Sequence, residues 1–133
     1  MNLKRAHLIV GLLGLAAFIG TGQYMHWVHA HLVGMADAPR MIYRSTHIYL
    51  LFASALNIVL GVYFVPDDAT PWRHRVQQLG SALILAAPLL LLAAFFREPW
   101  LQNFERPLTR PAVYAVFAGT LLHLISSART GKR

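Results

Sequence analysis

Histidine is the side chain in this sequence with the widest range of chemistry, and the chain has seven histidines and no cysteine. His26, His29 and His31 fall within one short stretch, QYMHWVHAHLVGM, and His47 follows in the next apolar segment. His7 lies inside an apolar run near the start of the chain. Neutral imidazole binds haem iron, copper and zinc, so the histidines indicate candidate binding sites.

The first candidate is a haem b site between His7 and His123. Haem needs axial imidazoles from facing helices, and its macrocycle needs a slot lined by small residues. Gly119 precedes His123 by about one helical turn, so it would leave room for a ring against that helix. The slot would be completed by Gly11 and Gly14, and the propionates would be met by Arg5 or Arg73.

The other histidines allow a second haem arrangement, in which His47 faces His26 or His29 and Arg40 or Arg44 meets the propionates. On one continuous helix, His7 and His26 would lie about 28 Å apart at a rise of 1.5 Å per residue. That separation is close to the thickness of the hydrocarbon core. One haem is therefore the more economical hypothesis, with His7 and His123 as the first pair of ligands.

A metal ion is the alternative to haem for these outer histidines. Imidazoles suit copper, zinc or iron, whereas thioethers select copper, and the same segment contains Met25, Met35 and Met41. If the first helix continued through this stretch, His26 and His29 would share a face as residues i and i+3. The candidate metal ligands are His26, His29, His31 and His47.

Other kinds of chemistry have no support in the sequence. There are only five acidic residues, and no carboxylate pair or Ser/His/Asp arrangement indicates acid–base or nucleophilic catalysis. No glycine-rich phosphate-binding loop is present. The net charge of +7 is better explained by membrane topology and contact with lipid headgroups than by nucleic acid.

The histidines are carried by four long apolar segments. Residues 6–36, 45–66, 76–96 and 111–128 contain no Asp, Glu, Lys or Arg, and a membrane-spanning helix needs roughly 20 apolar residues. The first segment is longer than a signal-peptide core and is followed by three more. We therefore predict one all-α domain, an integral membrane four-helix bundle with spans at about 6–30, 43–65, 72–96 and 109–129.

Local signals agree with these spans. Thr70–Pro71 and Thr109–Pro111 are typical helix starts, and Pro88 is expected to kink the third helix. Tyr24, Trp27, Tyr43, Trp72 and Trp100 fall near span ends, as in an aromatic belt. Seven basic residues on the side of the termini against five on the other side predict cytoplasmic N- and C-termini.

Polar residues inside the spans should face the bundle, because facing lipid is costly for them. Helical periodicity places His7, Gly11, Gly14 and Thr21 on one face of the first helix. On the second helix Asn57 is expected to make an interhelical hydrogen bond. The fourth helix aligns Ala112, Val116, Gly119 and His123, with Ser126 and Ser127 beside them.

Three short motifs resemble small four-helix membrane haem proteins, particularly the HemJ-type protoporphyrinogen oxidases and more distantly the CopD-like membrane proteins. They are LKRAH at the first helix, APRMIYR after it and LGVYF at the end of the second. The resemblance implies a haem ligand at His7. It does not extend to the third-helix lysine of that family, so it implies haem binding rather than porphyrinogen oxidation.

The sequence thus predicts a membrane protein that binds haem b and transfers electrons, alone or within a redox complex, in a bacterial inner membrane. A quinone or another membrane subunit is the expected redox partner. The lipid bilayer and other membrane subunits, or further copies of the chain in a homo-oligomer, are the expected partners. Two alternatives remain: a cofactor-free accessory subunit of a larger membrane complex, and an outer-face protein that binds copper or another metal ion.

Overall fold

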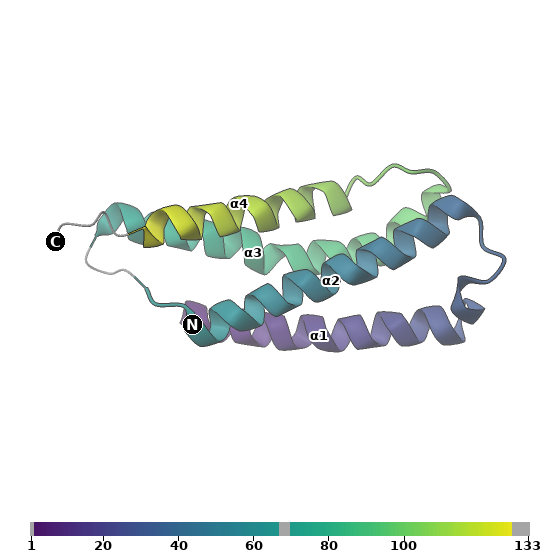
Figure 1. Cartoon of the computed structure of the whole chain (residues 1–133), viewed down its shortest axis with the longest axis horizontal. Helices are drawn as coiled ribbons and strands as arrows, with labels where there is room; N and C mark the ends of the chain where they lie inside the picture. Colours follow the sequence, from purple (N-terminus) through teal and green to yellow (C-terminus); the bar gives the residue numbers. More distant parts are fainter. Residues whose placement is uncertain (1, 67–69, 129–133) are drawn as a thin grey trace.

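The computed structural model describes residues 2–66 and 70–128, which form four α-helices and no strand. The helices are α1 (Leu3–Trp27), α2 (Asp37–Tyr63), α3 (Pro71–Arg97) and α4 (Thr109–Ser127), with short 3₁₀ helices η1 (Ala30–Leu32) and η2 (Glu98–Leu101). Consecutive helices run antiparallel (Figure 1). We call the end with the start of α1 and the end of α4 the terminal end, and the end with η1 and η2 the hairpin end.

Three of the four helices are long and apolar enough to cross a membrane: α1, α2, and α3 continued through η2. Their outward faces expose large apolar side chains such as Leu13 and Leu89, which water would disfavour. Trp27, Trp72 and Trp100 are exposed close to helix ends, where interfacial tryptophans belong. These features indicate a membrane protein. The fourth helix, α4, has 19 residues and packs along α3 (Figure 1).

Glycines allow the helices to approach closely in pairs. A Cβ on Gly61 of α2 would lie 2.7 Å from the backbone nitrogen of Leu8 on α1. A Cβ on Gly119 of α4 would lie 2.7 Å from the carbonyl oxygen of Gly80 on α3. Small residues that admit a neighbouring backbone are typical of helix contacts in bilayers. The bundle is therefore an α1–α2 pair packed against an α3–α4 pair.

The predicted inward faces are confirmed for most residues. His7, Gly11, Gly14 and Thr21 are buried on α1. On α2, Asn57 is fully buried. The buried residues of α4 include the predicted set, Ala112, Val116, Gly119, His123 and Ser126, but Ser127 is exposed.

The first helix ends three residues before its predicted end at about residue 30. Helix α1 stops at Trp27 instead of residue 30, and the chain then makes a left-handed turn. Ala30, His31 and Leu32 have φ values of 44°, 59° and 63°, a conformation that costs L-residues roughly 1–2 kcal/mol each. His26 and His29 consequently do not share a helix face, because His29 lies beyond the end of α1.

The start of the second helix and the N-cap residue of the fourth helix also differ from prediction. Helix α2 begins at Asp37 rather than near residue 43, which places an acidic side chain where the helix dipole favours it. Thr70 is the N-cap residue of α3, as predicted, and Pro71 follows it. At α4 the N-cap residue is Leu108, and Thr109 is the first helical residue. The predicted end of the fourth helix at residue 129 lies outside the described residues.

Candidate functional site

The first predicted pair of histidines comes together at the terminal end of the bundle. His7 on α1 is fully buried and His123 on α4 is 8% exposed. Their ring centroids are 6.4 Å apart, with 69° between the ring planes. Phe64, just after α2, packs edge-on against both imidazoles, with centroids 6.4 Å from His7 and 5.2 Å from His123. Three aromatic rings from three segments thus form one buried cluster.

Asn57 determines the orientation of His7. The Asn57 side-chain nitrogen donates to the carbonyl oxygens of Ala53 (2.9 Å) and Ile84 (3.0 Å). Its Oδ1 is therefore the atom that faces His7 Nδ1, at 2.7 Å. The predicted interhelical role of Asn57 is confirmed, since this side chain links α2 to both α1 and α3.

The same contact fixes the tautomer of His7. An amide oxygen accepts hydrogen bonds only, so Nδ1 of His7 carries the proton and donates it. Nε2 then has a free lone pair, and this atom is buried without a hydrogen-bond partner. A buried acceptor without a partner is costly. A metal-ligating histidine has this arrangement, with one nitrogen donating to a protein group and the other free to ligate.

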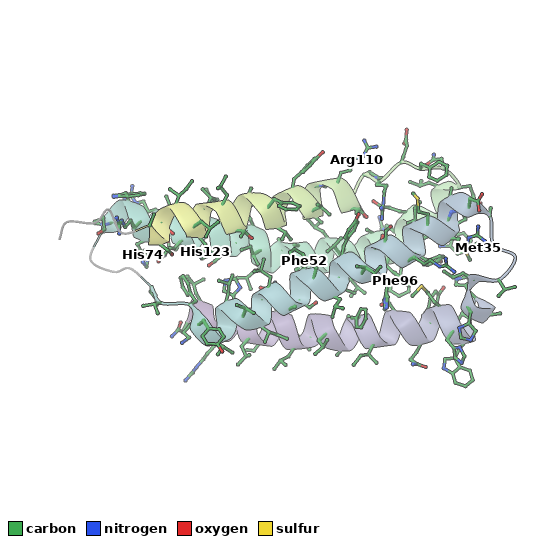
Figure 2. The ribbon with its side chains drawn as sticks, viewed as in Figure 1. Met35, Phe52, His74, Phe96, Arg110 and His123 are labelled. Atoms are coloured by element: carbon green, nitrogen blue, oxygen red, sulfur yellow. The ribbon has the colours of Figure 1, made fainter. Side chains whose placement is uncertain are left out.

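His123 is held from the side of α3. Its Nε2 lies 3.2 Å from the Ser81 hydroxyl, and the same ring edge lies against Gly80. The opposite edge, which carries Nδ1, faces away from α3. There a groove of about 410 Å³ opens between the ends of α2 and α4, lined by His123, Phe64, Tyr63 and Ser127 among others. Figure 2 shows His123 in the part of α4 near the terminal end.

The predicted haem slot beside Gly119 is filled by protein. A Cβ on Gly119 would meet a side-chain carbon of Ile84 at 2.6 Å as well as the Gly80 backbone. Gly11 and Gly14 are similarly covered by Ile58 and Ser54 of α2. These glycines contact neighbouring helices and do not line an open slot, and the role of Gly119 as a cofactor contact stays a prediction.

The outer histidines do not gather at one point. His26 and His31 meet at the hairpin end, with 2.5 Å between His26 Nδ1 and His31 Nε2, and both are exposed. His29 instead packs between Tyr24 and Tyr43. In the described part of the chain no three His, Asp or Glu side chains group as metal ligands.

His47 lies apart from these residues, on α2. Its Nδ1 is 2.9 Å from the Thr21 hydroxyl of α1, and its ring stacks on Phe18 with centroids 4.1 Å apart. Arg44, the predicted propionate contact beside it, is exposed. The interactions of His47 join α1 to α2, whereas the predicted pairing with His26 or His29 is not among them.

Sequence reasoning missed a buried carboxylate at the hairpin end. Glu98 is 1% exposed, and its Oε1 accepts from the backbone N–H groups of Leu108 and Thr109 at 2.8 Å each. Its Oε2 lies 3.7 Å from Nε of Arg106, and Nη2 of Arg106 donates to the Thr46 hydroxyl on α2 (2.7 Å). The one available signal was an acidic residue directly after a span, where buried charge needs a partner.

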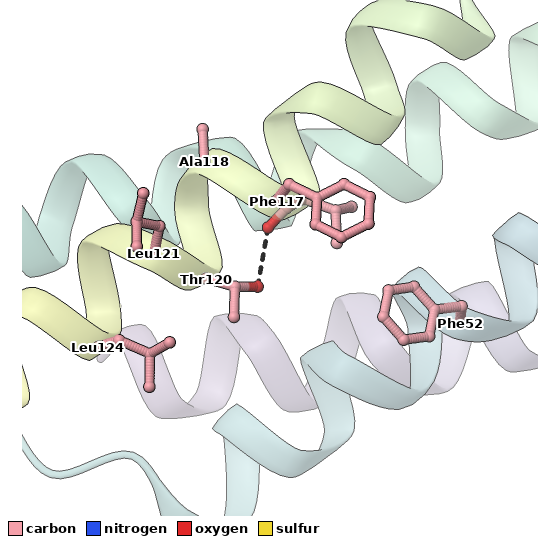
Figure 3. Close-up of a pocket in the computed structure, with 7 residues that line it drawn as sticks. Phe52, Phe117, Ala118, Thr120, Leu121 and Leu124 are labelled. Atoms are coloured by element: carbon pink, nitrogen blue, oxygen red, sulfur yellow. Dashed lines mark hydrogen bonds between the residues drawn. The ribbon is translucent and has the colours of Figure 1, made fainter.

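A second groove, of about 420 Å³, runs between α2 and α4 on the outer surface of the bundle (Figure 3). Phe52, Phe117 and Leu121 line it, and the hydroxyl of Thr120 is occupied by a 2.8 Å hydrogen bond to the Val116 carbonyl. Its lining therefore offers no free polar group for chemistry and suits hydrocarbon chains.

Protein-family models, curated proteins and solved structures were compared with this chain, and none of them matches it. The resemblance of LKRAH to haem-binding membrane proteins therefore stays a prediction.

Proposed function

We propose that this protein is an integral membrane electron-transfer protein that binds one haem b through His7 and His123. The proposal rests on one observation: His7 Nε2 is buried without a hydrogen-bond partner, while Nδ1 of the same ring is hydrogen-bonded to Asn57. Inside an apolar bundle this nitrogen needs a partner, and iron would provide one.

The spacing of the two rings supports the same proposal. With metal–nitrogen bonds of about 2 Å, two imidazoles whose centres lie roughly 6 Å apart could hold one metal ion between them. The His7 and His123 centroids are 6.4 Å apart. When bound, haem b would supply reversible one-electron chemistry. The chain would hold it by His7 and His123, and Asn57 would keep His7 in the ligating tautomer.

The surroundings of His7 and His123 indicate how haem and a quinone would reach these two residues. Because the helices fill the space at Gly119, the macrocycle would not lie there, and the groove beside Phe64 and His123 provides access from the bilayer. A quinone or quinol, being lipid-soluble, would approach His123 by the same groove. Arg5 is exposed at this end of the bundle and is our candidate for a propionate contact.

The proposal includes the placement of the chain in the membrane. At 1.5 Å per residue, α4 is about 28 Å long, nearly the hydrocarbon thickness, so it would be the fourth span. The excess of basic residues would put the terminal end, with His7 and His123, in the cytoplasmic leaflet of a bacterial inner membrane.

The visible spectrum of the protein purified from haem-sufficient cells tests this function. We expect the Soret and α bands of haem b and about one haem per chain. A colourless, monodisperse protein would overturn the proposal. His74→Ala is the matched control, because His74 lies at the same end of the bundle but outside the His7–His123 pair, and it should leave the haem content unchanged.

A second candidate function is that of a cofactor-free accessory subunit of a larger membrane complex. Gly11, Gly14, Gly61 and Gly119 are used for packing within this chain, whereas large apolar side chains such as Phe52 and Phe117 are exposed on the outside of the bundle and would be available to other membrane subunits. Mild solubilisation separates the two candidates. An accessory subunit would co-migrate with its partners and contain no haem, whereas the proposed cytochrome would retain haem when isolated.

A further inference from the structure

Like His7, His29 at the hairpin end has a buried imidazole nitrogen without a hydrogen-bond partner. Its Nε2 is inaccessible and makes no hydrogen bond. The ring lies between two tyrosines, with centroids 5.1 Å from Tyr24 and 5.0 Å from Tyr43. A buried nitrogen without a partner is costly, so a ligand bound beside it would stabilise this arrangement.

Two methionines pack against a buried cluster that includes Tyr43. Met25, from the last turn of α1, and Met35, after η1, both pack against the cluster formed by Leu32, Tyr43 and Phe95. Met35 also lines a cavity of about 130 Å³ together with His29 and Tyr43. Figure 2 shows Met35 at the hairpin end of the bundle. No carboxylate lines this cavity.

The backbone between His29 and Met35 contains a left-handed turn. Ala30, His31 and Leu32 all have positive φ values, and the residues on either side of this turn, His29 and Met35, line the same cavity. Strained residues persist where the surrounding structure holds them, and they are frequent at ligand-binding sites. The turn also buries Leu32 against the aromatic cluster.

We propose that His29, Met25 and Met35 form a binding site for a soft monovalent metal ion, Cu(I). Thioethers with one imidazole select Cu(I) over Zn(II), Mg(II) or Ca(II), which prefer harder or more numerous donors. Tyr24 and Tyr43 would shield the ion from water. This site differs from the predicted outer metal site, because His26 and His31 are exposed and His47 is bonded to Thr21. It does not depend on haem at the terminal end.

The test is anaerobic competition for Cu(I) between the purified full-length protein and a colorimetric Cu(I) chelator. We expect about one Cu(I) per chain with the wild type, loss of binding with His29→Ala, and at least a tenfold weaker affinity with Met35→Leu or Met25→Leu. Met→Leu nearly conserves volume, so the bundle should stay folded. Met41→Leu, at an exposed position, is the matched control and should bind like the wild type.

Two results would overturn the proposal. One is no Cu(I) binding by the folded wild-type protein. The other is binding that survives His29→Ala and Met35→Leu but disappears with His26→Ala or His31→Ala, which would assign the ion to the exposed pair. Because the assay reads Cu(I) and not haem, a colourless protein that binds Cu(I) would overturn the proposed cytochrome function alone.

Discussion

At the scale of single residues, Asn57 has the largest influence on the candidate site. Its amide nitrogen bonds to two backbone carbonyls, on α2 and α3, and its oxygen accepts from His7. Partners of this kind orient metal-ligating histidines and raise their basicity. The amide therefore joins three helices and also sets which nitrogen of His7 is free.

Asn57→Ala should consequently affect both stability and binding. Removing the amide leaves a buried His7 donor unpaired, so we expect the free energy of unfolding to fall by about 1–3 kcal/mol. Haem affinity should fall roughly 10–100-fold, as for other lost partners of metal ligands. Unfolding in detergent and haem titration measure these effects.

Ser54→Ala is the matched control for this change. Ser54 is equally buried, one turn earlier on α2, but its hydroxyl bonds only to the carbonyl of its own helix, at Leu50. An equal loss in Ser54→Ala and Asn57→Ala would contradict the special role of the amide.

Predictions for single residues succeeded where apolar surroundings leave a polar side chain few possible hydrogen-bond partners. A buried amide in the middle of a span has to bond to another helix, and Asn57 does. The position of His29, by contrast, lies next to a left-handed turn of three non-glycine residues. No local propensity predicts such a turn, since each residue in it is disfavoured there.

At the scale of helices, the start of α4 depends on a residue from the preceding segment. The first N–H groups of a helix lack partners within the helix, and Glu98 accepts from two such groups near α4 while pairing with Arg106. The spacing of eleven residues between Glu98 and Thr109 follows no capping motif. The sequence pattern therefore predicts a cap at Thr109 instead.

Glu98→Ala should destabilise the protein by about 3–5 kcal/mol, because breaking a buried pair leaves Arg106 without its counter-charge. Glu98→Gln should cost less, since its amide oxygen can still accept from the backbone. Thermal unfolding of the purified variants measures both. Glu105→Ala, at an exposed position in the same connection, should change little, and a comparable loss there would argue against the cap.

The glycine contact between α1 and α2 can be tested by comparing two glycine-to-alanine substitutions. Gly61→Ala would bring a methyl group within 2.8 Å of the Leu8 backbone, so we expect a loss of about 1–3 kcal/mol from overpacking. Gly20→Ala meets no atom within 4 Å and should be neutral or slightly stabilising, because alanine is the better helix former. Unfolding of the two variants, side by side, decides whether the α1–α2 contact is as tight as described.

At the scale of the whole molecule, the pattern of charge-free segments was sufficient to predict an all-helical bundle. The length and the apolar character of each segment can be read directly from the sequence. Three of the four predicted spans correspond to helices that are long and apolar enough to cross a membrane. What composition could not supply was how the helices pair. That depends on which glycine faces which backbone, as at Gly119 and Gly80.

The proposed topology can be tested because the chain has no cysteine. Single cysteines introduced at Glu105 and Ala128, both exposed, would report the hairpin end and the terminal end respectively. In intact bacterial cells, a membrane-impermeant thiol reagent should label the first variant and not the second. The reverse pattern would place both termini outside the cytoplasm.

The central claim is that His7 and His123 hold one haem b between them. Its most direct test is the electron paramagnetic resonance spectrum of the oxidised, purified protein and of His123→Ala. Two axial imidazoles should give a low-spin ferric signal in the wild type, and loss of one of them should convert it to high spin. A haem-free protein, or a low-spin signal unchanged in His7→Ala and His123→Ala, would contradict the claim.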